Sequence, residues 1–541
     1  MLPLYHTSDL IKILKTELFY MVNLTCRPPN SHRPDGLPVA IWPAFWYDGG
    51  MNPKEDMPMS INSNSSLLER LQAHKEEGYL SLHMPGHKEN AGLASYLSVL
   101  NADLDITELP GFDDLHDPEE VLARSMKKAA SLWGVPKSWF QVNGSTGALL
   151  AAIRGATHRG DKILVARNCH KAIYHAIELC GLEPVFLLPP VEETFGLSGS
   201  ITPEMVAAAL DEHPDVKLIV YPSPTYDGVL SDTAGICDVA HEKSIPVLVD
   251  EAHGAHLGLT DHFPPHAMAQ GADMAVASLH KMLPSLTQTA ILHATGRFLK
   301  LPQINRQTGI FQSSSPSYLL MASMDSCIRL LEEQKDDLFA AWSRRLAEFD
   351  DLAKGLKHLR LPGHGGEAGA SYPGIFGLDP AKIVISTRGS ALNGVELMER
   401  LREDYQIELE MALDRYAVAM TGLGTDDTMP ARLAKALLEL DEKYGPAEEV
   451  APLETLQELP PRKMSIEEAA MSEGRVDFLY DSMGKVCGEY IWAYPPGIPL
   501  ITPGEVITPA LVADVERLYR AGVKLIGTRG KPPYTTVSIE E

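Results

Sequence analysis

Six short apolar runs, each followed by polar and helix-forming residues, constrain the fold of this 541-residue chain most strongly. The runs are ILVA, VFLL, KLIVY, PVLV, MAVA and AILH, and they lie between residues 163 and 293. Continuous apolar runs that alternate with helical segments are typical of a mostly parallel sheet with helices on both faces. Ligands of such sheets bind outside the carboxyl ends of the strands, so residues that directly follow the runs are candidate site residues.

Two of these positions carry residues that suit one cofactor. Asp250 directly follows PVLV, and the string SLHK, which ends at Lys281, directly follows MAVA. A lysine amine can hold the aldehyde of pyridoxal phosphate as a Schiff base, and a buried carboxylate can keep the pyridine nitrogen protonated. A lone lysine is usually a surface residue, and strings such as DEAH also occur in nucleotide hydrolases, so the pair alone leaves both alternatives open.

A glycine-rich segment, NGSTG, precedes the apolar helical run ALLAAI and predicts a phosphate site. Its glycines let the backbone approach a ligand closely, Ser145 and Thr146 offer hydroxyl donors, and the helix N-terminus presents free N–H groups. A Walker loop would need a lysine after Gly147, but Ala148 stands there, which disfavours a nucleotide hydrolase. The three segments together predict pyridoxal phosphate as the cofactor.

The order and spacing of further motifs link the chain to a known family. The motifs are HMPGHK from His83, DITE, DDLH, RNCHK from Arg167, PTYDG from Pro224, SSPSY from Ser314, and YPPGIP and PGE near the C-terminus. With them the chain resembles the Orn/Lys/Arg decarboxylase family from about residue 65 to its end. The resemblance implies pyridoxal phosphate, the aspartate-aminotransferase fold type, and a shorter form without the N-terminal receiver-like domain. The implied fold class is α/β, with a mostly parallel, seven-stranded-type sheet and smaller α+β C-terminal domains.

The resemblance also implies a role for each matching residue. Lys281 would bind the cofactor aldehyde, Asp250 would hold the proton on the ring nitrogen, and His170 would stack on the ring face. His253 would line the ring edge, and Lys281 or His280 would return a proton to the substrate. The phosphate would be held by a set of small and polar residues: Ser145, Thr146, Gly147, Ser278 and His280. From the residues alone, His170 is more typical of one face of the amphipathic helix NCHKAIYHAIEL.

Two late motifs carry implications of a different kind. Ser314 would reach the phosphate of the neighbouring subunit, so the resemblance implies an obligate homodimer, with a higher assembly of dimers as an alternative. A monomer should then be inactive. Without the resemblance, SSSPSY is typical of a plain Ser/Pro loop, and YPPGIP is typical of a rigid extended connector.

The expected activity is decarboxylation of a basic amino acid to its amine and CO2 for polyamine metabolism, with arginine favoured over lysine and lysine over ornithine. An aminotransferase or β-eliminating lyase of the same fold is one alternative, but the late arginine typical of aminotransferases is not identifiable. A catalytically silent, cofactor-binding regulator is another, and it should lack Lys281, which is present. Asp227 and Glu505 are candidates for binding the substrate's distal cation by charge only, and structural roles for both stay open.

Composition limits the remaining partners. The net charge of −25 disfavours nucleic acid, which is bound through Lys and Arg, and it suits a cationic substrate as well as plain solubility. Six scattered cysteines form no CxxC pair, so the sequence predicts neither a metal site nor a disulfide framework. No apolar run approaches about eighteen residues, so no membrane span is expected and the cytoplasm is the default location.

The motifs and composition predict five regions. They are an extension (1–60), an N-terminal arm (61–115), a cofactor-binding large domain (116–340), a small α+β domain (341–445) and a C-terminal domain (446–541). The extension is Pro-rich and lacks periodicity, so we expect either disorder or a start codon placed too early, with Met51 as a natural beginning. A long linking helix is predicted over 331–359.

Overall fold

The computed structural model describes residues 64–448, 458–494 and 497–538. The predicted extension (1–60) lies outside the described residues. The first described helix is α2 (Leu67–Glu77), where Ser66 and Glu69 form a capping box, and it is followed by the short helix α3 (Ser95–Val99).

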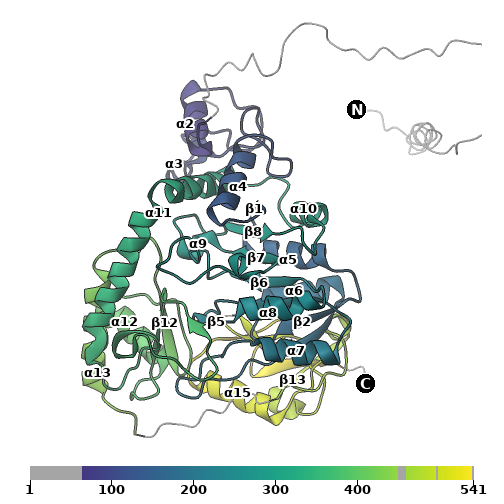
Figure 1. The fold of residues 1–541 in the computed structure, drawn as a ribbon, viewed down its shortest axis with the longest axis vertical. Coiled ribbons are helices and arrows are strands. Elements are labelled where there is room, and N and C mark those ends of the chain that lie inside the picture. The colour runs from purple at the N-terminus through teal and green to yellow at the C-terminus, as the bar shows by residue number, and fades with distance from the viewer. Residues whose placement is uncertain (1–63, 449–457, 495–496, 539–541) are drawn as a thin grey trace, which may run out of the picture. The chain divides into compact units, whose positions relative to one another are not determined.

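A seven-stranded sheet lies at the centre of the fold (Figure 1). Its spatial order is β1 (Lys137–Gln141), β8 (Ala290–Ala294), β7 (Met274–Ala277), β6 (Val247–Asp250), β4 (Val216–Pro222), β2 (Lys162–Ala166) and β3 (Glu183–Leu187). β8 pairs antiparallel with both of its neighbours, and the four remaining pairs of neighbours are parallel. The mostly parallel sheet is therefore confirmed.

Helices bury the sheet on both faces, as the apolar runs predict. The helices that accompany the strands are α4 (Val121–Leu132), α5 (Gly144–Ala156), α6 (Lys171–Cys180), α7 (Pro203–Glu212), α8 (Thr233–Glu242) and α10 (Leu301–Ile310). Every residue of β6, β7 and β8 is buried. Strands of this kind leave their functional residues only at their ends, because the interior of the sheet has no contact with solvent.

A helix of 35 residues, α11 (Tyr318–Leu352), leads from the sheet to a smaller α+β region. It begins 13 residues before the predicted linking helix because the Ser317 side chain caps it by accepting a hydrogen bond from the Leu320 N–H. The smaller region contains β10 (Lys382–Ser386), α12 (Gly394–Tyr405), β11 (Met411–Ala412), β12 (Tyr416–Met420) and α13 (Met429–Tyr444). Two helices accompany three short strands here, so this region is α+β. The short strands β5 (Val229–Leu230) and β9 (Gly377–Leu378) pair with each other.

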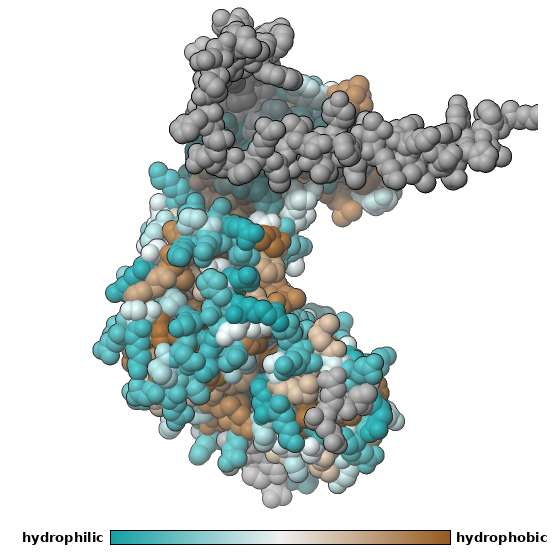
Figure 2. Space-filling model, turned by 90° about the vertical axis from the view of Figure 1, so that its right-hand side faces the viewer, coloured by the Kyte–Doolittle hydropathy of each residue, from teal (hydrophilic) through white to brown (hydrophobic). Residues whose placement is uncertain are grey.

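The C-terminal region adds further short strands and two helices. Its elements are α14 (Ile466–Met471), β13 (Gly474–Phe478), β14 (Ile491–Ala493), β15 (Ile498–Ile501), α15 (Pro509–Arg520), β16 (Leu525–Gly527) and β17 (Tyr534–Ser538). None of the described helices is long and apolar enough to cross a membrane. The face drawn in Figure 2 is mostly hydrophilic and carries separate hydrophobic patches.

A buried cluster around Glu505 links the C-terminal region to the end of β2. The Glu505 carboxylate lies 3.2 Å from the guanidinium of Arg167 and 3.2 Å from that of Arg462. Arg167 directly follows β2 and also donates a hydrogen bond of 2.8 Å to the Pro499 carbonyl. Glu505 therefore has a structural role, and both of its neighbouring cations already balance its charge. The same contacts hold Pro499 and Leu500 beside the residues that follow β2.

Candidate active site

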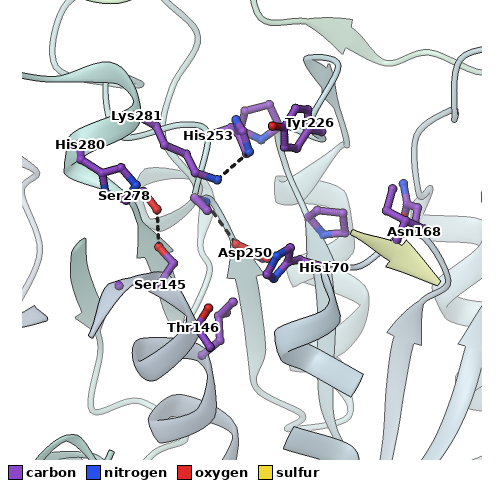
Figure 3. A pocket seen from close by; sticks show the side chains of 16 residues that line it. Ser145, Thr146, Asn168, His170, Tyr226, Asp250, His253, Ser278, His280 and Lys281 are labelled. Atoms are coloured by element: carbon purple, nitrogen blue, oxygen red, sulfur yellow. Dashed lines mark hydrogen bonds between the residues drawn. The ribbon is translucent and has the colours of Figure 1, made fainter. Parts of the chain in front are cut away.

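A cavity of about 240 Å³ is lined by residues that follow the carboxyl ends of five strands: β1, β2, β4, β6 and β7 (Figure 3). This is the position at which ligands of mostly parallel sheets bind. The lining residues are Gly144, Ser145, Thr146, Leu149, Asn168, His170, Pro222, Pro224, Tyr226, Asp250, Ala252, His253, Ser278, His280, Lys281 and Ile498. Most of the residues predicted from sequence are therefore brought together in one place.

Lys281 projects into this cavity from the four-residue helix α9 (Leu279–Met282), which follows β7. Its Nζ lies 2.8 Å from His253 Nε2 and 5.8 Å from the centroid of the Tyr226 ring. Burial lowers the pKa of Lys281, and the nearby Asp250 carboxylate partly opposes that shift. A lowered pKa raises the share of neutral amine, which is the form that bonds to an aldehyde carbon.

Asp250 ends β6 with its carboxylate buried at the base of the cavity. Burial raises the pKa of Asp250 to about 6, although the positive charge of Lys281 and a hydrogen bond of 3.2 Å from the Ala252 N–H both favour the charged form. In the described part of the chain, no cationic side chain lies within 4.0 Å of this carboxylate. A protonated ring nitrogen would supply the missing partner.

His170 lies at the N-terminus of α6, and its ring points into the cavity near Asp250 (Figure 3). Its Nδ1 accepts a hydrogen bond of 3.2 Å from the Ala172 N–H. Burial, followed by the charge of Lys281, lowers the pKa of His170 to about 3, so the ring is neutral at pH 7. Gly497 lies against this ring, because a Cβ added to Gly497 would lie 3.6 Å from His170 Nε2. A flat, neutral ring held between a helix start and a loop suits stacking on an aromatic cofactor.

Hydroxyl groups from two segments meet at the N-terminus of α5. Ser145 Oγ lies 2.6 Å from Ser278 Oγ, and Thr146 is the next residue of the helix. The helix starts at Gly144, whose φ of +69° favours glycine. Free backbone N–H groups, a positive dipole end and three hydroxyls match a phosphate group. The amine, carboxylate, ring and hydroxyls of this cavity therefore fit pyridoxal phosphate.

The structure gives finer detail on two predicted phosphate residues. His280 lines the cavity and donates from Nδ1 to the Thr289 carbonyl at 2.7 Å, which fixes its tautomer. Gly147 is not among the lining residues. A Cβ added to Gly147 would lie 2.9 Å from Asn143 Cβ and 3.2 Å from the Phe311 carbonyl oxygen, so tight packing of α5 requires a glycine there.

Several predicted residues lie away from the cavity. Ser314 is exposed in the loop before α11 and does not line the cavity of its own chain. Asp227 is buried, and its carboxylate accepts hydrogen bonds from Thr225 and, at 3.1 Å, from Tyr416. His83 in the HMPGHK motif lies 3.4 Å from Glu89, also outside the cavity.

The same arm brings together a group that the scattered sequence positions did not indicate. Ligand-type atoms of His74, His83 and Glu89 all lie within 4.8 Å of one another. This distance would allow the three side chains to share a metal ion, and the expectation of no metal site stays a prediction.

Sequence reasoning did not identify two groups next to Lys281. Tyr226 lines the cavity, its ring centroid lies 4.4 Å from that of His253, and its hydroxyl donates to Glu410. Lys382 Nζ lies 3.0 Å from His253 Nδ1. The PTYDG motif was the signal for Tyr226, whereas Lys382 and Glu410 reach the site only through tertiary packing.

The raised pKa of Asp250 predicts how the cofactor-free protein responds to pH. Because the folded state holds this proton more tightly than the unfolded state, the contribution to stability is complete below about pH 4 and is lost as the pH rises through about 6. Asp250→Asn removes this loss, so the variant should be more stable than the parent above pH 6, by up to about 3 kcal/mol. Urea unfolding of both proteins across this pH range measures the difference.

Asp273→Asn is the matched control for this experiment. Asp273 is also buried, but its carboxylate lies 2.8 Å from His241 and accepts a hydrogen bond of 2.9 Å from the Val247 N–H. Its replacement should lower stability at neutral pH, because it removes a buried, charged acceptor from two hydrogen bonds. An Asp250→Asn protein that is less stable than the parent at pH 8 would contradict the burial argument.

Comparison with known proteins agrees with the geometry. Residues 65–357 match the sequence model described as Orn/Lys/Arg decarboxylase, major domain. An arginine decarboxylase of Halalkalibacterium halodurans is 33% identical over 476 residues, which cover 87% of this chain and 96% of that protein. An arginine decarboxylase of Bacillus subtilis is 32% identical over 468 residues, which cover 84% of this chain and 94% of that protein.

Solved structures show the same fold. The lysine decarboxylase LdcF of Francisella novicida superposes with a TM-score of 0.73 at 18% identity, and the match covers 87% of this chain and 81% of that one. The constitutive lysine decarboxylase of E. coli gives a TM-score of 0.72 at 19% identity, with the same coverage. The sequence match over the main domain, the sheet and the cavity at its carboxyl edge lead to one conclusion: this chain belongs to the Orn/Lys/Arg decarboxylase family of pyridoxal-phosphate-dependent carboxy-lyases.

Proposed function

We propose that this enzyme decarboxylates arginine in preference to lysine, and lysine in preference to ornithine, and that the amine product serves polyamine metabolism. Decarboxylation of a basic amino acid is supported by relatives that are named arginine and lysine decarboxylases. The preference for arginine is supported by four arginine decarboxylases that are 30% to 33% identical to this chain. The observation that carries the proposed decarboxylation is that Lys281 and the buried carboxylate of Asp250 line one cavity (Figure 3).

Pyridoxal phosphate, when bound, supplies an electron sink for the carbanion that remains after CO2 leaves. Each residue of the cavity then has a distinct task in the proposed reaction. Asp250 holds a proton on the ring nitrogen, His170 covers one ring face, and Ser145 with Ser278 anchors the phosphate. Lys281 binds the cofactor before the substrate arrives, and afterwards either Lys281 or His280 adds a proton to the substrate carbon. Burial strengthens these electrostatic contacts because little water competes for them.

Glu410 is the carboxylate that we propose to bind the distal cation of the substrate. The two candidates taken from sequence are already engaged, since Glu505 pairs with two arginines and Asp227 accepts hydrogen bonds from Thr225 and Tyr416. Glu410 is exposed, and it accepts a hydrogen bond from Tyr226, which lines the cavity. Its negative charge also raises the pKa of Lys281, so it lies close enough to act on groups in the cavity.

A homodimer is also part of the proposal. The arm exposes large apolar side chains, with Leu80 at 84%, Leu82 at 83% and Val99 at 81%. Apolar side chains gathered on one segment in this way favour a protein interface. Ser314 is exposed and lies outside its own cavity, which suits a role in the cavity of a second copy.

A side-by-side assay tests the proposed activity. The enzyme loaded with pyridoxal phosphate should release CO2 and an amine from arginine, with lower rates on lysine and lower still on ornithine. Lys281→Ala should abolish turnover, because no other lysine lines the described cavity. Release of a keto acid instead of CO2 would favour an aminotransferase, and equal rates on the three amino acids would remove the preference for arginine.

Glu410→Gln tests the distal contact. Loss of a charge-assisted hydrogen bond costs about 1.5 to 3 kcal/mol, so the KM for arginine should rise by roughly tenfold or more while kcat changes little. Glu408→Gln is the matched control, because Glu408 is also exposed and pairs with Arg402 at 3.0 Å. An unchanged KM in the Glu410 variant would show that the distal cation is bound elsewhere.

Mixed dimers test whether Ser314 acts across the interface. Lys281→Ala and Ser314→Asp should each be inactive alone, because one loses the amine and the other repels the phosphate. Refolded together, they should recover about a quarter of the parent activity, since half of the dimers are hybrids with one intact site. Mixing Lys281→Ala with Asp250→Ala is the control, and it should recover nothing, because both residues belong to the same cavity. Equal failure of both mixtures would contradict the shared site.

A further inference from the structure

A second lysine, Lys382, lies directly behind the cavity. It is the first residue of β10 in the smaller α+β region, and it is only 3% exposed. Its Nζ lies 3.0 Å from His253 Nδ1, and on the other side of the same ring His253 Nε2 lies 2.8 Å from Lys281 Nζ. Three basic groups from three separate segments therefore form one continuous hydrogen-bonded chain that ends at the Lys281 amine.

The surroundings of Lys382 leave its charge without a direct counter-ion. Three carboxylates act on it, namely those of Asp379, Asp227 and Glu410, yet in the described part of the chain none lies within 4.0 Å of its Nζ. The nearest other partner is Met282, whose sulfur lies 3.5 Å away. Burial lowers the pKa of Lys382 to about 7, and the charge of Lys281 adds to that shift.

Each of these carboxylates has another partner. Asp379 lies 3.0 Å from His256 Nε2, Asp227 accepts hydrogen bonds from Tyr416 and Thr225, and Glu410 accepts one from Tyr226. The position of Lys382 also depends on the PTYDG loop. A Cβ added to Gly228 would lie 2.7 Å from Lys382 Cβ, so the glycine leaves room for the lysine stem. The packing therefore places an amine here and leaves its proton unpaired with any single acid.

The His253 ring can accept a hydrogen bond from only one of the two lysines at a time, and it must donate to the other. Burial and the charges of both lysines lower the pKa of His253 well below its usual range, so the ring is neutral. A neutral imidazole carries one N–H and one lone pair, so it accepts from one lysine and donates to the other. When the Lys382 ammonium donates to Nδ1, the ring must present Nε2–H to Lys281.

Decarboxylation requires a supply of protons, which the hydrogen-bonded groups Lys382, His253 and Lys281 could deliver. The reaction replaces a carbon–carboxylate bond with a carbon–hydrogen bond and so consumes one proton in each turnover. We propose, resting on the function above, that Lys382 is the proton donor that recharges Lys281 through His253. One N–H bond of the Lys382 ammonium breaks as His253 Nδ1 gains the proton, and the His253 Nε2–H proton passes to Lys281 Nζ. Lys281 becomes an ammonium, Lys382 becomes a neutral amine, and solvent restores the Lys382 proton before the next turnover.

Replacement of Lys382 tests the relay in the complete enzyme. Lys382→Met keeps an unbranched side chain, one atom shorter and without a charge, and Lys382→Gln keeps a donor for His253 Nδ1 without a transferable proton. In both variants the rate of amine formation from arginine should fall by about 100-fold. The share of turnovers that end in an aldehyde should rise, because a proton misplaced onto the cofactor yields an aldehyde instead of an amine.

The control is Lys435→Met, on the exposed face of α13, where Nζ lies 3.8 Å from Glu439. This variant should leave the rate of amine formation and the share of aldehyde product unchanged. In a His253→Phe background, Lys382→Met should cause no further loss, because the relay is already broken. Either folded Lys382 variant with the parental rate and aldehyde share would overturn the relay, and the Gln variant decides the question if the Met variant does not fold. Absence of CO2 from the parent enzyme would instead remove the proposed function.

A second measurement needs no cofactor. The lowered pKa of Lys382 means that the folded state releases this proton near pH 7, whereas the unfolded chain keeps it until about pH 10. The parent should therefore gain stability relative to Lys382→Gln as the pH rises above 7, and urea midpoints of both cofactor-free proteins follow this change. A constant gap between the two midpoints from neutral to alkaline pH would show that Lys382 does not exchange its proton in the folded protein, and would overturn the relay.

Discussion

The burial of Asp250 is the constraint on which the rest of the site depends. Asp250 is the last residue of β6, and its buried carboxylate is poorly solvated, so it favours either a proton or a cationic partner. Its pKa of about 6 shows that the protein alone does not satisfy it. A positively charged ring nitrogen would supply the missing partner, and His170 and Lys281, which line the same cavity, would hold the ring that carries it.

The parallel sheet is the reason that these groups meet. Strands that run in the same direction end at the same edge, so residues far apart in sequence arrive together there. Asp250 follows β6, the SLHK turn follows β7, and the NGSTG segment follows β1. The C-terminal region then completes the edge from outside. The buried ion pairs of Glu505 hold residues 497–501 near Arg167, and Gly497 is thereby placed against the ring of His170.

The sequence was sufficient to predict the parts of the site that depend on local patterns. Lys281, Asp250 and the hydroxyls of Ser145 and Ser278 all follow strand-like runs or a glycine turn, and the structure brings them together. Lys382 was not predicted, because it is 129 residues from His253 in sequence and no local pattern links them. Strand β1 lacks a continuous apolar run, since Lys137, Ser138 and Gln141 interrupt it, so its position was not identified either.

Burial shifts the pKa values of two groups near the cavity in opposite directions. Burial raises the pKa of Asp250 and lowers that of Lys382, so each group is driven towards its neutral form near neutral pH. In the proposed function, the Asp250 carboxylate would stay charged beside a protonated ring nitrogen, because that partner would carry a positive charge. Lys382 has no such partner within ion-pair distance among the described residues, and in the proposed relay it passes its proton to His253. A buried lysine with an acidic neighbour at contact distance would retain its proton, so the separation of Lys382 from Asp379, Asp227 and Glu410 favours release of its proton.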